Sequence, residues 1–506
     1  MGLFRNLVAL GLLASQVSAV CDATFRAALT AAENNWSADT TISFPDDEDA
    51  FLAATRRWSP YKPPTFSAAV TVANENDIAT AVKLARAHDI PFLATGGRHG
   101  YGSTMGELEL GLSIDLSQLT SAVVDKEAAT LTVGGGARAH HILQPVNEAG
   151  FEMQVGGCSC PGLVGVTIGA GANHWQGVHG LVLDALLHVR LITAEGEIVE
   201  ASKDINPDLF WAIRGAGANF GIIAEATYQL SPQTNNDEIL IVDIAYPAST
   251  NVSYYNAIEK LIANQPPNLS HVSVTLWNFT FSAPIVVGNF LYFGPKEEGM
   301  ALLQPFYDLD PFFSAESVVS WSKVYDTALL GSDAMNCLPG LVHSPYGSVM
   351  KNISVPTMIR SFERMAKFYT DYPAGRMTSA TYQRAGNEAT LAIPEESTAY
   401  PWRDAEAYQY VLLTFPPGDT VTEAAAHQLG REIRDDYAAT SGYGGLAVYV
   451  NTAQGDETLE QRYGAHKLPR LASLKAEWDP DNVFRFHHAL PTSYPAAAIP
   501  AHQEDL

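Results

Sequence analysis

Cysteine is scarce in this sequence of 506 residues, which has four: Cys21, Cys158, Cys160 and Cys337. So few cysteines exclude a fold built on a disulfide framework. Cys158 and Cys160 lie two positions apart, and no further Cys or His pair follows at the spacing of a zinc site. The pairing of Cys21 and of Cys337 stays open at this point.

Basic residues are also few. The sequence has 30 Lys and Arg against 55 Asp and Glu, a net charge of −25, and no run rich in Lys or Arg. A nucleic-acid binder needs a basic surface to replace the counterions of phosphate. We therefore expect no nucleic-acid partner, and the acidity favours solubility.

Long apolar runs are missing beyond the N-terminus, since no later segment reaches the roughly 18 residues that a membrane helix needs. At the N-terminus, Arg5, a short apolar stretch at 7–13 and small residues at 17–19 predict a signal peptide over 1–19, cleaved after Ala19. A short buried helix is the alternative. Five glycosylation sequons agree with export, at Asn35, Asn251, Asn268, Asn278 and Asn352. The sequence predicts a secreted protein without a membrane partner, and a monomer.

Short strands and helices alternate over residues 61–232 and predict an α+β region. We expect strands at 68–72, 92–94 and 130–133, a half-buried strand at 112–116, a helix capped by Asn74, a helix that stops at Gly150, and a hairpin of 188–193 with 198–201. Over 233–440, strands at 239–245, 273–281 and 285–293 precede helices at 357–369 and 422–440. This pattern predicts a second unit, an antiparallel sheet with helices on one side.

Three glycine-rich stretches suit the close approach of backbone to a phosphate: residues 95–102 (TGGRHGYG), 156–171 (GGCSCPGLVGVTIGAG) and 214–221 (RGAGANFG). None is a dinucleotide fingerprint of the G-x-G-x-x-G type. His174 and Phe220 stand where the third glycine belongs, and no acidic residue follows at the expected distance. A Rossmann domain is therefore not expected.

These stretches, HGLVLD at 179–184, DLFWAIRGAGANFGII at 208–223 and the tail at 449–484 occur in the order typical of one family. The chain resembles the berberine-bridge-enzyme-like branch of the vanillyl-alcohol-oxidase superfamily over about residues 61–490. The resemblance implies a lead-in at 20–60, a PCMH-type FAD-binding domain at 61–232, a substrate domain at 233–440, and a C-terminal segment at 441–506 that returns to the FAD domain.

The resemblance also implies covalent FAD. His99 matches the histidine that bonds the 8-methyl group of the flavin, and Cys158 matches the cysteine that bonds its 6-carbon, with Cys160 as the alternative thiol. Further FAD contacts are implied at Thr95, Gly96, Gly97, Arg98, Gly100, Gly165, Thr167, Gly169, Gly171, Gly221, Ile223 and Asn482.

The sequence departs from the family pattern at several positions that line the flavin. Pro161 replaces a valine that influences oxygen access, Ala170 and Asn173 replace glycines, and residues 178–181 read VHGL where the family has Arg or Lys followed by YGL. These departures weaken the prediction that dioxygen is the electron acceptor, but they do not affect the prediction that FAD is the cofactor.

Catalysis needs a base for the O–H or N–H proton of the substrate. By resemblance this base is Tyr449, with Asn451 on the same face of a strand, although Thr452 replaces the tyrosine that usually follows. A core tyrosine is the alternative reading, and His174, His487 and His488 are other candidate bases. Some relatives use a carboxylate from the substrate sheet, and the sequence does not assign one. We expect no metal, because His174 and His179 lie five residues apart, out of phase on a helix.

The expected function is an FAD-dependent oxidase that takes a hydride from a small-molecule alcohol or amine and passes electrons to dioxygen, giving hydrogen peroxide. Secondary-metabolite biosynthesis is one setting for it. The alternatives are an oxidative cyclase, a carbohydrate oxidase that stacks sugars on Trp277, Trp321 and Tyr325, and a binding protein without turnover. Retention of His99 and Cys158 argues against the last of these.

Overall fold

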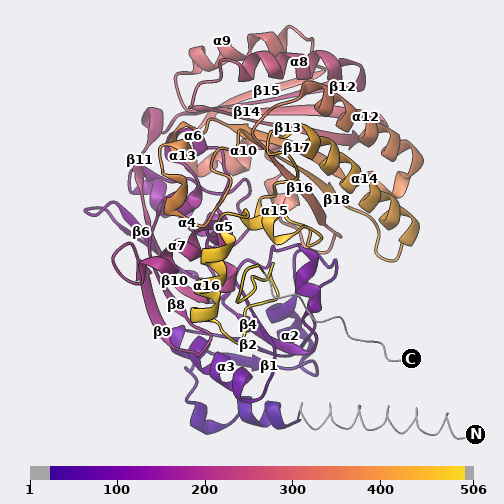
Figure 1. Cartoon of the computed structure of the whole chain (residues 1–506). Coiled ribbons are helices and arrows are strands. Elements are labelled where there is room, and N and C mark those ends of the chain that lie inside the picture. The colour runs from indigo at the N-terminus through magenta and orange to yellow at the C-terminus, as the bar shows by residue number, and fades with distance from the viewer. Residues whose placement is uncertain (1–22, 496–506) are drawn as a thin grey trace, which may run out of the picture.

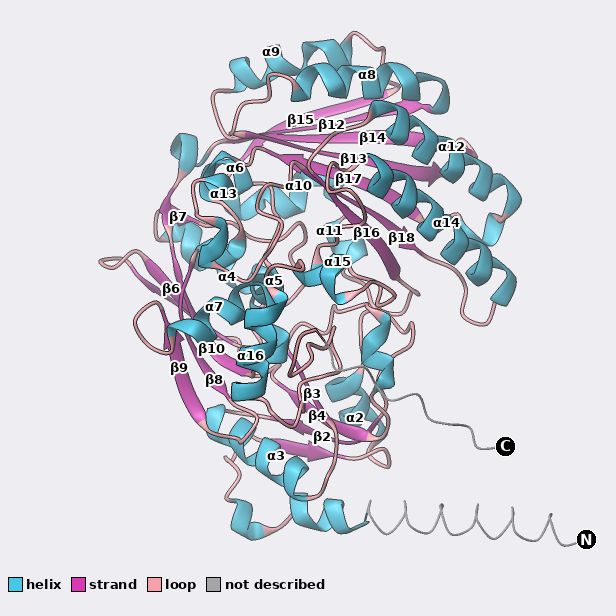
Figure 2. Cartoon of the chain, in the orientation of Figure 1, coloured by secondary structure: helices cyan, strands magenta, loops and turns pink. Residues whose placement is uncertain are grey.

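The computed structural model describes residues 23–495, which form three main sheets with helices around them (Figure 2). The predicted signal peptide at 1–19 and Cys21 lie outside the described residues. None of the described helices combines the length and the apolar character that crossing a bilayer requires. The α+β prediction is confirmed.

The first sheet has the order β1-β2-β4-β3, with β2 and β3 both parallel to β4. Its strands are β1 (Thr41–Ser43), β2 (Phe66–Thr71), β3 (Phe92–Thr95) and β4 (Gly111–Asp115), with helices α2 (Glu48–Thr55) and α3 (Glu75–Ala87) packed on it. As predicted, Asn74 caps α3, because its Oδ1 accepts the backbone N–H groups of Asn76 and Asp77. The strand predicted at 112–116 is β4, but its half-burial was wrong: every residue of β4 is buried, because β4 lies between β2 and β3.

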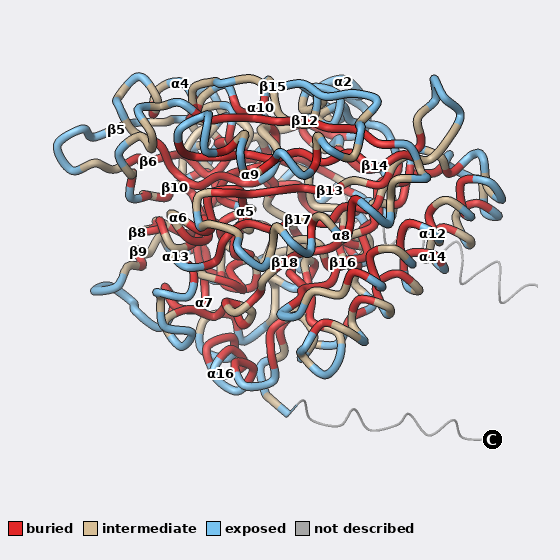
Figure 3. Tube along the Cα trace, turned by 90° about the horizontal axis from the view of Figure 1, so that it is seen from above, coloured by how far each residue is buried: buried red, intermediate tan, exposed pale blue. Residues whose placement is uncertain are grey.

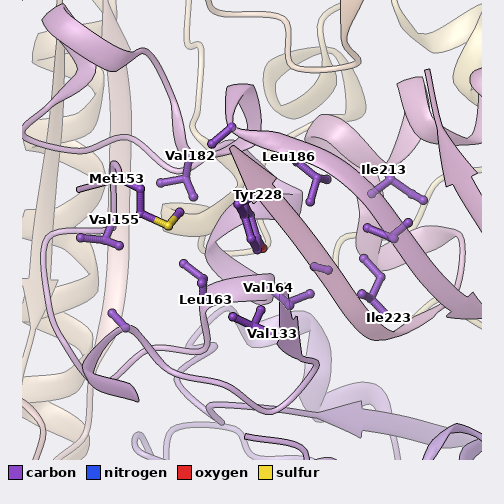
Figure 4. Packing of buried hydrophobic residues seen from close by; sticks show 14 of the residues in the cluster. Val133, Met153, Val155, Leu163, Val164, Val182, Leu186, Ile213, Ile223 and Tyr228 are labelled. Carbon is purple, nitrogen blue, oxygen red and sulfur yellow. The ribbon is translucent and has the colours of Figure 1, made fainter. Parts of the chain in front are cut away.

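The second sheet is antiparallel, in the order β5-β6-β10-β8-β9, and includes the predicted hairpin of β8 and β9. Its strands are β5 (Ala122–Asp125), β6 (Thr130–Gly134), β8 (Leu186–Ile192), β9 (Ile198–Ser202) and β10 (Ile222–Gln229). β7 (Phe151–Glu152) pairs separately with β11 (Ser231–Pro232). Helices α4 (Ala139–Glu148), α5 (Leu163–Gly169) and α7 (Pro207–Ala216) share its core, where Tyr228 of β10 packs beside Leu163 and Val164 of α5 (Figure 4).

The third sheet has seven antiparallel strands in the order β15-β12-β14-β13-β17-β18-β16. The strands are β12 (Ile239–Pro247), β13 (Leu269–Asn278), β14 (Ala283–Tyr292), β15 (Phe313–Val319), β16 (Ser344–Met350), β17 (Ser379–Ala385) and β18 (Ala407–Leu413). One face is covered by α8 (Asn251–Ile262), α9 (Lys296–Tyr307), α12 (Val355–Asp371) and α14 (Thr420–Thr440), as predicted (Figure 1).

The opposite face of this sheet is turned toward the first two sheets (Figure 1). In the view from above, the strands are buried along most of their length except the edge strand β15, while buried and exposed residues alternate along α12 and α14 (Figure 3). The connections contain the short helices α6 (Gln176–His179), α10 (Val324–Gly331), α11 (Asp333–Asn336) and α13 (Glu388–Leu391). Side chains on the open face are therefore available to a site between the layers.

The C-terminal segment forms α15 (Leu459–Tyr463) and α16 (Leu468–Trp478), which lie against the N-terminal half of the chain (Figure 1). A fully buried Lys475 holds this segment in place. Its Nζ donates to the backbone oxygens of Asn219 (2.9 Å) and Phe484 (3.0 Å) and to Asp479 Oδ2 (2.6 Å). Burial lowers the pKa of Lys475, which the Asp479 carboxylate opposes.

We expect Lys475→Met to lower the free energy of unfolding by about 3–5 kcal/mol, because Asp479 then remains buried without its cation. Urea denaturation followed by tryptophan fluorescence measures the change. Lys367 and Asp371 form a matched control, an exposed Lys–Asp pair with the same i,i+4 spacing. Lys367→Met should change stability far less. Equal losses in the two variants would contradict this role of the buried pair.

Candidate active site

A cavity of about 1290 Å³ lies between the first two sheets and the open face of the seven-stranded sheet. Ligand pockets for one drug-sized molecule are usually about 300–1,000 Å³. This cavity is larger, so it has room for a cofactor and a substrate together. Its wall includes loops from all three glycine-rich stretches and the start of the C-terminal segment.

Most of the predicted FAD contacts line this cavity: Thr95, Gly96, Gly97, Arg98, His99, Gly100, Cys158, Gly165, Gly169, Gly221 and Ile223. Three lie outside the lining. The Thr167 hydroxyl donates to Leu163 O inside the core, Gly171 packs on Val182 with a positive φ of 82°, and Asn482 lies in the turn after α16. Thr167 and Gly171 therefore support the wall from behind.

The glycines and polar groups of the lining fit a dinucleotide. On the Cβ side of Gly157 and Gly165 no atom lies within 4 Å, so the backbone there is open to a ligand. The Thr95 hydroxyl is buried in the lining without a hydrogen-bond partner. Four arginines line the cavity, at 57, 98, 376 and 485, and no Asp or Glu is among the described lining residues. Arg98 is paired with Asp115 and Arg376 lies over Trp277, which leaves Arg57 and Arg485 as positive groups for the pyrophosphate of FAD.

His99 lies in a stack of three rings. Trp58 stacks on His99 at 4.7 Å between ring centroids and on His343 at 4.0 Å. Burial, assisted by the charge of Arg138, lowers the pKa of His99 to about 3. The imidazole is therefore neutral near pH 7 and has a free nitrogen lone pair, as bond formation to a flavin methyl group requires.

Trp58 is a residue that the sequence analysis missed, because it lies in the lead-in at 20–60 and in no glycine-rich stretch. Its Nε1 donates to Asn336 O at 2.8 Å, and its backbone N–H donates to Arg98 O at 3.2 Å. His343 is fixed in turn, with Nδ1 3.1 Å from Thr414 Oγ1. The three stacked rings thus join the loop that carries His99 to the part of the chain that forms the seven-stranded sheet.

The sulfur atoms of three cysteines lie within 4.8 Å of one another, but two of them are bonded. Cys160 and Cys337 form a disulfide, and Cys158 is a free thiol whose Sγ lies 3.2 Å from Cys160 Sγ. Burial raises the pKa of Cys158 to about 12. The disulfide engages Cys160, the alternative flavin thiol, and gives Cys337 a partner, so Cys158 is the free thiol of the three.

Tyr449 and Asn451 meet at the cavity wall, although the predicted strand was wrong. Tyr449 directly precedes a 3₁₀ turn, η10 (Val450–Thr452), which brings the Asn451 Nδ2 atom to 2.7 Å from the Tyr449 hydroxyl. The hydroxyl also accepts the N–H of Gly171 at 3.0 Å. Burial raises the pKa of Tyr449 to about 12, and these donated hydrogen bonds oppose the rise by stabilising the phenolate.

The other candidates fall into two groups. His174 and His487 line the cavity, each with a pKa lowered to about 4 by burial, whereas His488 lies outside the lining with Nδ1 3.0 Å from Arg462. Of the three aromatic residues proposed to stack sugars, Trp277 alone lines the cavity. Trp321 and Tyr325 are buried in the core behind it, so the predicted sugar platform is not formed.

Two glycines of α5 allow a test of this geometry. A methyl group at Gly169 would overlap the Asn451 amide, whereas one at Gly165 would enter the open cavity. We expect Gly169→Ala to lower stability by about 1–3 kcal/mol, as overpacking does. Gly165→Ala should keep the melting temperature of the flavin-free protein and lower the flavin content, read from the ratio of visible to ultraviolet absorbance. Full flavin content in Gly165→Ala would contradict this placement of the cofactor.

Comparison with known proteins identifies the family of this chain. A family model described as an FAD binding domain matches residues 66–202, and one described as berberine and berberine like matches residues 448–491. The chain is 43% identical over 457 residues to FAD-linked oxidoreductase srdI of Neurospora crassa, covering 90% of each chain. It is 41% identical over 465 residues to FAD-linked oxidoreductase fogF of Aspergillus ruber, covering 91% of this chain and 93% of that one.

Solved structures share the fold at low sequence identity. BBE-like 1 of Physcomitrella patens has a TM-score of 0.77 at 20% identity, with 90% of this chain and 98% of that chain covered. The 6-hydroxy-D-nicotine oxidase of Arthrobacter nicotinovorans has a TM-score of 0.74 at 20% identity, covering 90% and 99%. The xylooligosaccharide oxidase of Myceliophthora thermophila has a TM-score of 0.72 at 21% identity, covering 88% and 95%. With relatives above 40% identity along nine-tenths of its length, the chain belongs to the berberine-bridge-enzyme-like family of FAD-linked oxidoreductases.

Proposed function

We propose that this oxidoreductase removes a hydride from a small-molecule alcohol or amine and transfers the electrons to dioxygen, giving hydrogen peroxide. One observation carries the proposal: the Tyr449 hydroxyl, with two hydrogen-bond donors aimed at it, lines the same cavity as His99 and Cys158. Bound FAD supplies the hydride acceptor and the route to dioxygen. The protein has to supply the base and the orientation.

Tyr449 is the residue that takes the proton of the substrate. Its phenolate is stabilised by the N–H of Gly171 and by Asn451 Nδ2, which are already in place. With a pKa of about 12, the phenolate is strong enough to withdraw an alcohol proton as the hydride departs. No carboxylate lies among the described lining residues, so the carboxylate base of some relatives has no counterpart here.

We propose that the flavin is bonded to both His99 and Cys158. Both residues line the cavity: neutral His99 supplies a nitrogen lone pair, and Cys158 supplies a sulfur that attacks as the thiolate once its proton has left. Dioxygen, the proposed acceptor, takes up the two electrons released for each bond formed. Tethering raises the potential of a flavin, and about 30 mV adds about 1.4 kcal/mol of driving force to a two-electron transfer. A tethered cofactor also cannot be lost by dilution, which suits a protein outside the cell.

We further propose that the enzyme is a secreted, glycosylated monomer. The signal-peptide pattern and the sequons support export. Asn35 and Asn352 have exposed side chains and suit glycan attachment, whereas Asn251, Asn268 and Asn278 are half-buried. Mass spectrometry of the protein from the medium, with and without a glycosidase that removes N-glycans, would locate the attached sugars.

The test of the proposed activity separates its two half-reactions. The purified holoenzyme is mixed without oxygen with a panel of primary alcohols and amines, and bleaching of the flavin is followed by stopped flow. Air is then admitted, and we expect one hydrogen peroxide for each flavin reoxidised. Bleaching followed by no peroxide would refute dioxygen as the acceptor, and no bleaching with any member would refute the proposed substrate class.

A further inference from the structure

We propose that the substrate is an alcohol carried on an extended apolar body, which lies along the seven-stranded sheet and reaches a mouth edged by exposed apolar side chains. The inference rests on the oxidase function proposed above. It concerns the outer part of the cavity, which the cofactor motifs do not explain.

The wall formed by the sheet is mainly apolar. Alternating residues of β13, namely Val272, Val274 and Leu276, face the cavity, and Val287 of β14 and Leu412 of β18 extend this surface. Polar side chains enter mainly from β17 between them, as Ser379, Thr381 and Gln383. A substrate body against this wall gains more from burying carbon than from hydrogen bonding.

The mouth of the cavity is also apolar, and unusually exposed. Of the eighteen large apolar side chains exposed among the described residues, six line this one cavity: Phe279, Leu330, Met335, Leu338, Leu341 and Met377. Their exposed fractions run from 47% for Leu341 to 72% for Met335. Such a cluster marks a binding surface, because scattered apolar side chains do not gather at one opening by chance.

Part of the mouth is formed by a backbone segment in an unfavourable conformation. Leu329 and Leu330 both have positive φ, 52° and 60°, which leucine rarely adopts. The N–H of Leu330 donates to the carboxylate of buried Asp243 at 2.9 Å, which fixes the segment in this conformation. This strained conformation leaves a leucine half-exposed at the mouth, which supports an apolar ligand at this surface.

A carbohydrate fits this cavity poorly. Trp277 is the one residue of the predicted sugar platform that reaches the lining, and the Arg376 guanidinium lies over its ring, 3.9 Å from the centroid. One face of the indole is therefore taken. The apolar wall would also leave most hydroxyls of a sugar without partners, which is costly for buried polar groups.

The experiment compares two probe series on the holoenzyme. 4-Alkylbenzyl alcohols with chains of one to six carbons report reduction, because a benzylic carbon gives up hydride readily, and the matching 4-alkylbenzaldehydes report binding through the flavin spectrum. We expect the dissociation constant of the aldehydes to fall by up to about fourfold per added methylene. Xylobiose, the sugar probe, should neither perturb nor reduce the flavin.

Variants locate the effect at the mouth. Met335→Ser combined with Leu338→Ser should flatten the dependence on chain length, because the outer carbons then stay in water. Leu391→Ser is the matched control, since Leu391 is 52% exposed on α13 and lies outside the cavity lining. It should keep the full dependence.

The outcomes separate the inference from the proposed function. Aldehyde binding that tightens with chain length, without reduction by any alcohol, would keep the apolar site and refute the oxidase proposal. Reduction by xylobiose together with no chain-length effect on binding would keep an oxidase and overturn the apolar substrate. A chain-length effect that survives in Met335→Ser/Leu338→Ser would overturn the role of the mouth.

Discussion

Replacing Tyr449 with phenylalanine is expected to slow flavin reduction by about 10²–10⁴-fold, the usual contribution of a positioned general base. The phenyl ring keeps the packing of Tyr449, and the change removes the one hydroxyl to which Gly171 N–H and Asn451 Nδ2 are both directed. Stopped-flow reduction without oxygen measures the rate, and the visible spectrum verifies that FAD is still bound.

The pH dependence gives a second measure of the same group. Burial raises the pKa of Tyr449 to about 12, so the phenolate fraction increases with pH throughout the accessible range. Reduction by the unaltered enzyme should therefore accelerate as the pH rises, and the Tyr449→Phe variant should lose this acceleration. Tyr408→Phe is the matched control, because the Tyr408 ring packs 5.7 Å from that of Tyr449 but lies outside the cavity lining. A comparable loss in both variants would indicate a packing effect.

The second large effect is expected on the attachment of the flavin. His99→Ala should keep the flavin bonded through Cys158, and Cys158→Ala should keep it bonded through His99, because each residue supplies an independent bond. The double variant should release all of its flavin on acid denaturation. The measurement is the visible absorbance of the protein and filtrate fractions after denaturation and ultrafiltration.

The neighbouring cysteines provide the control for this attachment. Replacing Cys160 and Cys337 together with serine removes the disulfide but leaves the Cys158 thiol. Bonded flavin should persist in a His99→Ala background carrying these two changes. Its loss would show that Cys160 is the linked residue. Flavin that stays with the denatured protein in the His99→Ala/Cys158→Ala double variant would contradict the assignment outright.

Much of the fold follows from local sequence patterns. Asn74 predicts the start of α3 because a short side-chain oxygen can accept two backbone N–H groups, and the turn at 194–197 predicts the hairpin of β8 and β9. Alternation misled at β4, because its polar side, Ser113 and Asp115, is buried as well: Ser113 Oγ donates to Ala54 O, and Asp115 accepts from Arg98. The spacing of Tyr449 and Asn451 predicted a strand, because residues two positions apart lie on the same face of a strand. In the structure a 3₁₀ turn brings the two side chains together instead.

The site is less predictable because its members come from distant parts of the chain. Cys160 and Cys337 are separated by 177 positions, and no local pattern distinguishes Cys158 from Cys160 as the free thiol. Trp58 and His343 belong to no motif, yet Trp58 stacks on His99 and His343 stacks on Trp58. The sugar platform was wrong for the same reason, since Trp321 and Tyr325 look like available aromatic residues until the core places them.

The disulfide closes a covalent ring of residues 160–337, which takes in parts of both halves of the enzyme. Cys160 belongs to the loop that carries Cys158, and Cys337 lies between Met335 and Leu338 at the mouth. In the chain-entropy model, closing a ring of this size lowers the entropy of the unfolded chain and so stabilises the folded state by about 5 kcal/mol. In the folded enzyme the bond fastens the apolar edge of the entrance two residues from Cys158, the thiol proposed to hold the flavin, and so limits how far the opening can move away from that end of the cavity.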